Sequence, residues 1–282
     1  MSAVLGSATA PAPLRDPAAR ARASALVVVV IVLWPLLALA EFKPWHLFDS
    51  GNLQVMGSFL AGFLPPATAP DFLALLWKAT LETLAIATAG IALAFVVAAP
   101  LAVVATRALA VSRIGPGPGR GGGAALRTAT RAVLTLLRAI PEVVWALVFV
   151  RALGLGPGAG VLALAVTYGG MLGKVWSEIV DSGEARPARA LLEAGSSRLA
   201  TVFYALVPLN AGELASYTVY RWECAVRASV VMGFVGAGGL GQLMDQSMKM
   251  LNGGEASAIL IVFLLLVLLA DAISAVVRKV LA

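Results

Sequence analysis

Several charged side chains stand inside stretches of sequence that are otherwise strongly apolar. They form three pairs of opposite charge at a spacing of four residues: Arg138 with Glu142, Lys174 with Glu178, and Glu223 with Arg227. Residues spaced in this way share one face of a helix, so each pair can neutralise itself. Because a lone charge in an apolar layer costs several kcal/mol, such residues are either internal ion pairs or contacts for a charged solute.

Arg221 differs from these pairs because it has no acid three or four residues away on its own helix. Its nearest acid, Glu223, points about 200° around the helix axis. Arg221 is therefore the best candidate for contact with an anion. We expect a substrate pathway lined by Arg221, Glu223, Arg227, Arg138 and Lys174.

Catalytic and metal-binding chemistry has few candidates in this sequence. It contains one histidine, His46, and one cysteine, Cys224, which excludes a Cys/His metal cluster and an internal disulfide. Two G-x-G-x-x-G patterns, at 117–122 and 236–241, lack the strand and helix context of a nucleotide site. Gly173-Lys174 is not followed by Ser or Thr, as a phosphate-binding loop would require. The sequence therefore predicts a protein that is no enzyme and binds no metal or cofactor itself.

The composition places these residues in a membrane. Of the 282 residues, 60% are hydrophobic and 13% are charged, and the mean hydropathy is +0.91; a soluble protein has about a quarter charged residues. A bilayer-spanning helix needs about 20 apolar residues. Runs of this kind cover 24–40, 75–106, 132–153, 160–180, 213–235 and 256–277. We expect an all-α polytopic membrane protein with about six transmembrane helices.

The basic residues indicate how these helices are oriented. Arginine and lysine concentrate in 1–23, 107–131, 181–212 and the C-terminal end, whereas the opposite side carries Lys43, Lys78, Arg151 and Lys249. Excess positive charge marks cytoplasmic connections, so both termini are expected in the cytoplasm. The same distribution argues against a nucleic-acid surface as the reason for the net charge of +6.

The first apolar run, 24–40, has two interpretations. Its ending, Ala38-Leu39-Ala40, resembles a signal-peptidase site, but its length and the long polar lead favour an uncleaved first helix. The next segment is interrupted by prolines and predicts an external connection with an interfacial helix. We expect residues 1–72 to form this N-terminal part and residues 73–282 to form the main transmembrane domain.

Two glycine-rich segments predict breaks between helices. Residues 115–123 have a Gly/Pro composition that cannot hold a helix, so the connection 107–131 is expected to be a flexible linker. The segment 235–241 contains Gly236, Gly238, Gly239 and Gly241. It predicts either a hinge or gate at the outer end of a pathway, or close packing of helices.

The connection 181–212 is amphipathic. Its apolar residues recur near helical spacing: Leu191, Leu192, Leu199, Val202, Phe203 and Leu206. Gly195 interrupts this pattern, and Pro208 is expected to end it. A helix, a turn and a second helix on the cytoplasmic face would present one apolar and one polar face, as the docking of a soluble partner requires.

The interval from Gly195 to Pro208 resembles the cytoplasmic EAA loop of ABC importer permeases. Four further blocks are similar to the phosphonate-type permeases of this class: 138–149 (RAIPEVVWALVF), 170–174 (GMLGK), 220–223 (YRWE) and 233–241 (GFVGAGGLG). The resemblance implies the type I ABC importer permease fold. It also implies that the loop, about 181–212, forms a coupling helix for an ATPase, through Arg189, Ala190, Glu193, Ala194, Gly195, Ser196 and Pro208.

This resemblance implies a bacterial inner-membrane importer with two permease copies, two cytoplasmic ATPase subunits that use ATP and Mg, and an external substrate-binding protein. Its substrate would be a phosphorus oxyanion: an organophosphonate, phosphite, a phosphate ester or phosphate. Arg189 stands where the EAA loop usually has a glutamate, which predicts either an ATPase with altered complementarity or a second, paralogous permease with the standard loop. An amino-acid importer of the methionine type, a transporter that works without an ATPase and a membrane enzyme stay open as alternatives.

Overall fold

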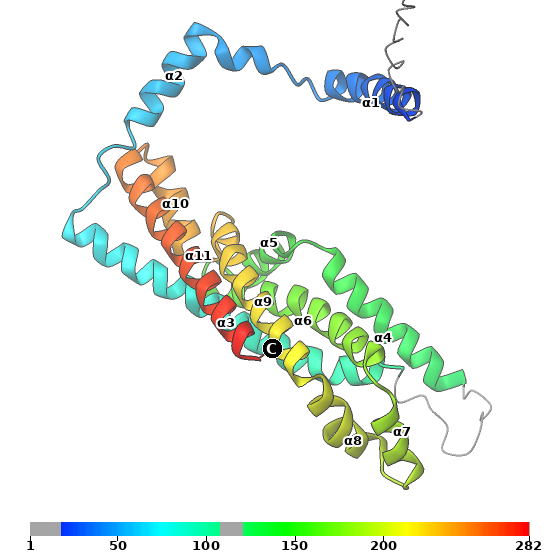
Figure 1. The fold of residues 1–282 in the computed structure, drawn as a ribbon. Coiled ribbons are helices and arrows are strands. Elements are labelled where there is room, and N and C mark those ends of the chain that lie inside the picture. The colour runs from blue at the N-terminus through cyan, green and yellow to red at the C-terminus, as the bar shows by residue number, and fades with distance from the viewer. Residues whose placement is uncertain (1–17, 108–120, 282) are drawn as a thin grey trace, which may run out of the picture. The chain divides into compact units, whose positions relative to one another are not determined.

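The structure is a computed structural model that describes residues 18–107 and 121–281 of the chain. Every regular element in these residues is a helix (Figure 1). Contacts divide the chain into two units, Met1–Ser58 and Phe59–Ala282. Within the described ranges, five helices are long and apolar enough to cross a membrane, or up to six if a bent pair counts as one span. These findings confirm the prediction of an all-α membrane protein with about six spans.

The first unit contains one helix with the length and composition of a membrane span. α1, Ala19–Leu39, starts beside Arg20 and Arg22 and continues through a Val- and Leu-rich stretch. None of its apolar window is buried. A short 3-10 helix, η1 (Pro44–Phe48), and α2 (Ser50–Ala61) follow. The helix expected in the connection after the first span is therefore present as α2.

The second unit is a bundle around two long helices. These are α3 (Pro70–Ala105) and α6 (Pro157–Ser182), and they pack with α9 (Val207–Gly233), α10 (Gly239–Lys249) and α11 (Gly253–Leu281). Small residues let the helices approach closely: a Cβ at Gly90 would lie 2.6 Å from the Cβ of Leu164 in α6. In a bilayer, close packing of this kind holds helices together, because lipid tails are as apolar as the side chains.

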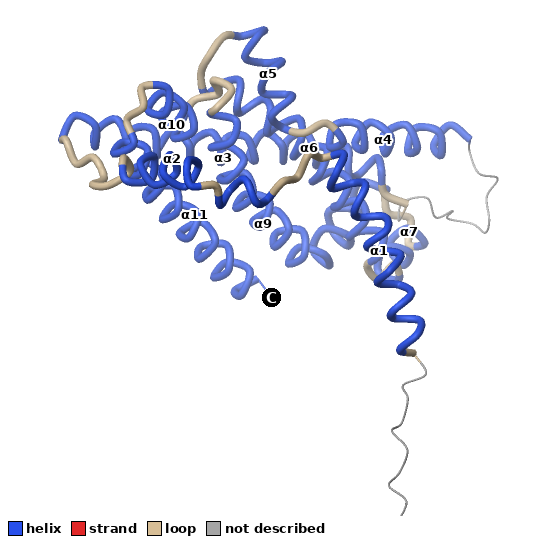
Figure 2. The backbone as a smooth tube through the Cα atoms, turned by 90° about the horizontal axis from the view of Figure 1, so that it is seen from above, coloured by secondary structure: helices blue, strands red, loops and turns tan. Residues whose placement is uncertain are grey.

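The third predicted span is broken. α4 (Gly121–Ala139) and α5 (Glu142–Leu153) meet at an angle of 84°, and Figure 2 shows α5 turning away from α4. The expectation of one helix over 132–153 is therefore wrong. The reason is Pro141, which has no N–H for a helical hydrogen bond and disfavours helical geometry in the residue before it. It takes the N-cap position of α5 with a ψ of 143°.

The connection between α3 and α4 contains more helix than predicted, because α4 begins at Gly121. The expectation of a flexible linker over 107–131 is wrong for its last part, 121–131. Ala124, Ala125 and Leu126 are strong helix formers, which extend the helix back into the glycines. The rest of the predicted linker, 108–120, lies outside the described residues.

The connection after α6 folds as a helix, a turn and a second helix, as predicted. α7 spans Arg186–Glu193, α8 spans Arg198–Thr201, and a π-helical segment, Val202–Leu206, leads into α9. The turn depends on Gly195, whose φ of +92° lies in the left-handed region that favours glycine. Ser197 then caps α8 by accepting a hydrogen bond from the Ala200 N–H.

Pro208 does not end the helix as predicted. It lies in the first turn of α9, where a helix tolerates a residue without an N–H. The π segment before it changes the hydrogen-bond pattern, because the Val207 N–H bonds to the Val202 carbonyl, five residues earlier. The chain therefore passes from α8 into α9 without a stop.

Candidate anion pathway and coupling element

α9 presents an arginine beside two tyrosines. The Nε–H of Arg221 donates a hydrogen bond to the Tyr217 hydroxyl at 2.7 Å. The guanidinium carbon lies 5.0 Å from the ring centre of Tyr217 and 5.5 Å from that of Tyr220. Aromatic faces attract a cation without neutralising it. Among residues 18–107 and 121–281 no acid forms an ion pair with Arg221, so its charge remains available to an anion.

A buried carboxylate lies close by on the same helix. The Glu223 side chain is 6% exposed, and its Oε1 accepts a hydrogen bond from Nη2 of Arg227 at 2.7 Å. Its Oε2 lies 3.8 Å from Nη2 of Arg278, at the end of α11. The Arg278 guanidinium lies 5.9 Å from the ring centre of Tyr220. The predicted pair of Glu223 and Arg227 is present, but two arginines share this carboxylate and the group stays positive.

Arg278 is a residue that sequence reasoning missed. Its place near the end of the sequence indicated orientation in the membrane and nothing more. It stands on another helix than Glu223, so no spacing rule relates the two. The packing of α11 against α9 brings them together.

The bend between α4 and α5 gives Arg138 and Glu142 separate roles. The described chain shows no ion pair between them, because the expected common helix face does not exist. The backbone of Arg138 instead packs against α6, where a Cβ at Gly170 would lie 3.0 Å from the Arg138 nitrogen. Glu142 starts α5, on the other side of the bend.

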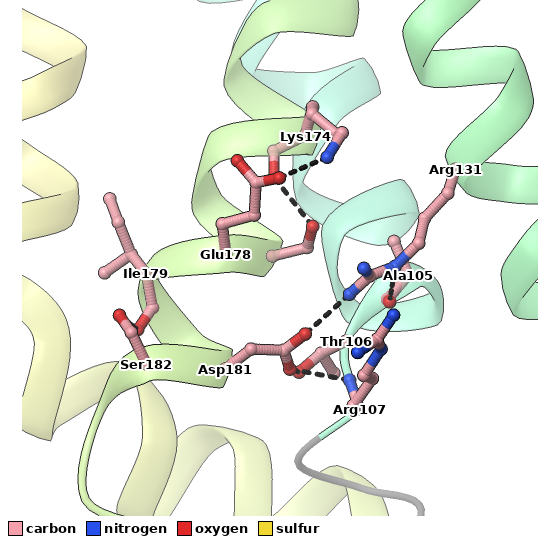
Figure 3. A network of polar contacts seen from close by, with 10 residues as sticks. Ala105, Thr106, Arg107, Arg131, Lys174, Glu178, Ile179, Asp181 and Ser182 are labelled. Atoms are coloured by element: carbon pink, nitrogen blue, oxygen red, sulfur yellow. Dashed lines mark hydrogen bonds and ion pairs between the residues drawn. The ribbon is translucent and has the colours of Figure 1, made fainter.

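Lys174 lies apart from this group. It forms the predicted ion pair with Glu178, one turn further along α6 (Figure 3). In the part of the chain that the structure describes, no hydrogen bond or ion pair joins it to the α9 arginines. Of the predicted pathway residues, the structure gathers Arg221, Glu223 and Arg227 on α9. It places Arg138 in the last turn of α4 and Lys174 in the second half of α6.

α9 and α10 are separated by backbone that glycine adopts more easily than other residues. The φ angles are +91° at Gly236, +86° at Gly238 and +69° at Gly239. A Cβ at Gly241 would collide with the carbonyl oxygen of Val230. The segment 235–241 therefore contains a break between helices, as a hinge would need, and also packs closely against α9.

A small cavity lined by both polar and apolar residues adjoins these glycines. Its volume is about 290 Å³, and the residues around it include Gly239, Lys78, Glu82, Gln242 and Gln246. Lys78 and Glu82 come from the first half of α3, and the two glutamines come from α10. The cavity thus lies at the end of the bundle opposite to α7, where a gate is expected.

The element formed by α7, α8 and the π segment has one apolar and one polar side. Ala188, Leu192, Val202 and Leu206 are buried and pack with Val103 of α3 and Val180 of α6. The residues that resemble the coupling loop lie mostly on the open side: Arg189, Ala190, Glu193, Ala194 and Gly195 are exposed, and Ser196 is half-buried. The predicted amphipathic element is therefore present, except that Leu199 and Phe203 of its expected apolar side are exposed.

A second polar group that the sequence analysis missed lies where α6 ends (Figure 3). Asp181 Oδ1 accepts hydrogen bonds from the Thr106 hydroxyl and from the backbone N–H of Arg107, each at 2.6 Å. Asp181 Oδ2 forms an ion pair with Nη2 of Arg131 at 2.5 Å. We call this group the Asp181 clamp: Asp181, Thr106, Arg107 and Arg131. The one sign of this clamp in the sequence is the position of Asp181 at the start of an arginine-rich connection.

These features define a class: a membrane-embedded transport subunit with charged residues on its helices and an amphipathic element at one end of the bundle. The chain belongs to the family of binding-protein-dependent transport system inner membrane components, whose model matches residues 112–282. It is therefore the permease subunit of an ABC importer. Permeases of this family are multi-pass inner-membrane proteins, are not catalytic themselves, and work with ATPase and substrate-binding partners.

Named relatives and solved structures agree with this assignment. The chain is 38% identical to the phosphite transport system permease protein PtxC of Stutzerimonas stutzeri over 83% of each chain. It is 34% identical to the phosphate-import permease protein PhnE of Mycolicibacterium smegmatis, over 86% of this chain and 42% of that protein. The inward-facing MetNI methionine ABC transporter matches 76% of this chain and 100% of its own at a TM-score of 0.64 and 23% identity. The type I ABC importer permease fold is confirmed.

Proposed function

We propose that this permease moves a phosphorus oxyanion: phosphite, an organophosphonate, a phosphate ester or phosphate. The observation that carries the proposal is Arg221, which two tyrosines position and no acid in the described ranges neutralises. Tetrahedral oxyanions bind arginine through charge-assisted hydrogen bonds, which strengthen where water is excluded. The relatives named for phosphite transport and phosphate import support the same class of substrate.

In the proposed pathway, Arg221 and Arg227 contact the anion, and Arg138 adds positive charge from the end of α4. Glu223 prevents the site from holding the anion too strongly, because a pathway must release what it binds. Lys174 lies closer to the C-terminal end of α6 and would contact the anion at a later point along the pathway. Gly236, Gly238, Gly239 and Gly241 would let α10 move as a gate at the outer end.

The proposed importer contains a second permease copy, two cytoplasmic ATPase subunits and an external substrate-binding protein. ATP and Mg act on the ATPase, and this chain binds no cofactor. We place both chain termini in the cytoplasm, which puts α7 and residues 194–196 on the side of the ATPase. Arg189 is exposed on this side. The ATPase subunit would therefore carry an acidic residue opposite Arg189, or a paralogous second permease would supply the standard contact.

Uptake by proteoliposomes that contain the permease, its ATPase and its substrate-binding protein tests this function. Labelled phosphite, phosphate and methylphosphonate are compared with methionine. We expect ATP-dependent uptake of at least one phosphorus compound and none of methionine. Uptake of methionine alone would assign the chain to amino-acid import, and uptake without the ATPase would make it a stand-alone transporter.

Two variants test the role of Arg221 in the same assay. Arg221→Ala should abolish uptake while the ATPase stays bound, because the anion loses its cation. Arg221→Lys keeps the charge but loses the planar group that stacks on the tyrosines and binds two oxygens, so partial uptake is expected. Normal uptake by Arg221→Ala would remove Arg221 from the pathway.

A further inference from the structure

The Asp181 clamp joins three helices through one carboxylate, at the ends of α3 and α6 and in the middle of α4. Asp181 belongs to α6, Thr106 and Arg107 follow the last turn of α3, and Arg131 belongs to α4. Arg131 also donates its Nε–H to the carbonyl of Ala105 at 2.8 Å. This carbonyl belongs to the last turn of α3, where helical partners are missing. One arginine therefore holds the end of α3 and the carboxylate of α6 at the same time.

The clamp is sheltered enough to act as a mechanical link. The side chains of Arg131 and Asp181 are 20% and 17% exposed. Charge-assisted hydrogen bonds of this length are stronger than neutral ones, and partial burial protects them from screening by salt. The ends of α3 and α6 are thus held to the middle of α4 by polar contacts as well as by packing.

The clamp stands directly before the amphipathic element. α6 ends at Ser182, and α7 begins at Arg186, so residues 183–185 alone separate the two helices. This short link runs against α9, since a Cβ at Gly183 would lie 2.5 Å from Oδ1 of Asn210. Because this link is short and packed against α9, a movement of α7 is passed on to Asp181.

The other side of the clamp leads back to the pathway. Arg131 and Arg138 belong to the same helix, α4, seven residues apart. Arg138, which we propose as a pathway residue, stands in the last turn of α4, and its backbone nitrogen would lie 3.0 Å from a Cβ at Gly170 of α6. A shift of α4 at Arg131 therefore changes the position of Arg138 relative to the α9 group.

We infer that Asp181 is a positioning residue that transmits the movement of α7 to α3 and α4, and through α4 to the arginines of the pathway. This inference rests on the proposed docking of the ATPase at α7. Without the clamp the ATPase still binds the permease and hydrolyses ATP, but α3 and α4 no longer move together with α7. The consequence is uncoupling: less substrate moves for each ATP consumed.

The test measures substrate transported per ATP hydrolysed in the reconstituted importer. Asp181→Asn retains an oxygen that can accept from Thr106 and Arg107 but removes the charge that holds Arg131. We expect the amount of assembled complex and its ATP hydrolysis to stay within about twofold of the wild type, while the ratio falls about fivefold or more. If complex yield and hydrolysis fall together with uptake, Asp181 supports the fold and transmits nothing.

Two further variants separate the link from a general effect of charge. Asp245→Asn removes a carboxylate whose ion pair with Lys249 stays within α10, so the ratio should remain that of the wild type. Arg131→Gln should lower the ratio at least as much as Asp181→Asn does, because it also removes the bond to Ala105. The double variant should be no worse than Arg131→Gln alone, because both changes break the same ion pair. Additive losses would overturn the inference.

The outcomes also distinguish this inference from the proposed function. Absence of ATPase binding or ATP-driven uptake in the wild type would overturn the proposed docking and transport. A wild type that transports normally, next to an Asp181→Asn variant with an unchanged ratio, would overturn the role of the clamp alone.

Discussion

The Nε–H of Arg221 and the hydroxyl oxygen of Tyr217, one turn apart on α9, are joined by a hydrogen bond of 2.7 Å. A hydroxyl accepts this bond without adding a negative charge, as a carboxylate would. The bond uses Nε and leaves the two terminal nitrogens of the guanidinium for other partners. Tyr217 therefore fixes the direction of the cation and preserves its charge.

Tyr217→Phe removes this acceptor and keeps the aromatic ring. We expect the guanidinium to rotate more freely, so that the KM for the transported anion rises while the maximal rate changes little. A hydrogen bond with a charged donor contributes about 1.5–3 kcal/mol, which corresponds to roughly a tenfold or larger increase in KM. The measurement is initial uptake against substrate concentration in proteoliposomes. Tyr204→Phe is the matched control, because the Tyr204 side chain is 80% exposed; equal KM values for both variants would contradict the role of Tyr217.

Glu223→Gln is expected to destabilise the permease. The change leaves the charges of Arg227 and Arg278 without the buried carboxylate between them. Loss of a hydrogen bond to a charged group costs about 1.5–3 kcal/mol, so the Tm in detergent should fall clearly. Asp245→Asn breaks a more exposed pair and should cost less than about 1 kcal/mol. A thermal shift no larger for Glu223→Gln than for Asp245→Asn would show that this carboxylate adds little to stability.

Gly241→Ala is expected to prevent correct packing of α9 and α10. The added Cβ would collide with the Val230 carbonyl and lie 2.9 Å from the Cα of Gly233, and neither backbone can move easily. Gly158→Ala, in the first turn of α6, meets nothing within 4 Å and should cost nothing. Expression and monodispersity after extraction are the measurements. A well-behaved Gly241→Ala protein would show that this contact can relax.

The ion pairs within one helix could be predicted from the sequence because they depend on local geometry alone. Lys174 with Glu178 and Glu223 with Arg227 follow from the spacing of four residues. Arg138 with Glu142 has the same spacing and fails, because Pro141 between them breaks the helix. The proline is visible in the sequence, but hydrophobic spacing alone does not show that it breaks an otherwise apolar run.

Contacts between helices could not be predicted in this way. The approach of Arg278 to Glu223 and the ion pair of Arg131 with Asp181 join residues that are 55 and 50 positions apart. Their formation depends on how α11 packs on α9 and α4 on α6, which hydrophobic spacing on a single helix does not determine. The approximate number of spans, in contrast, follows from the thickness of the bilayer, and five long apolar helices with one bent pair agree with it.

Gly195→Ala should weaken the attachment of the ATPase without harming the core of the permease. The φ of +92° at Gly195 is unfavourable for a residue with a Cβ, although no atom lies within 4 Å of the place where the Cβ would be. Left-handed backbone costs a non-glycine residue about 1–2 kcal/mol, so the turn between α7 and α8 should open in part of the molecules. We expect the Kd of the permease for its ATPase to rise about fivefold or more, measured in detergent with purified subunits.

Gly195→Asn is the matched control, because asparagine adopts left-handed backbone more readily than alanine does. Its Kd should lie between those of the wild type and of Gly195→Ala, while the thermal unfolding of the permease alone stays close to that of the wild type in both variants. This order follows from backbone strain at one turn, since both substitutions add a side chain in open space. Unchanged affinity in Gly195→Ala would mean that the ATPase does not depend on this turn, and the proposed docking site at α7 would have to be placed elsewhere.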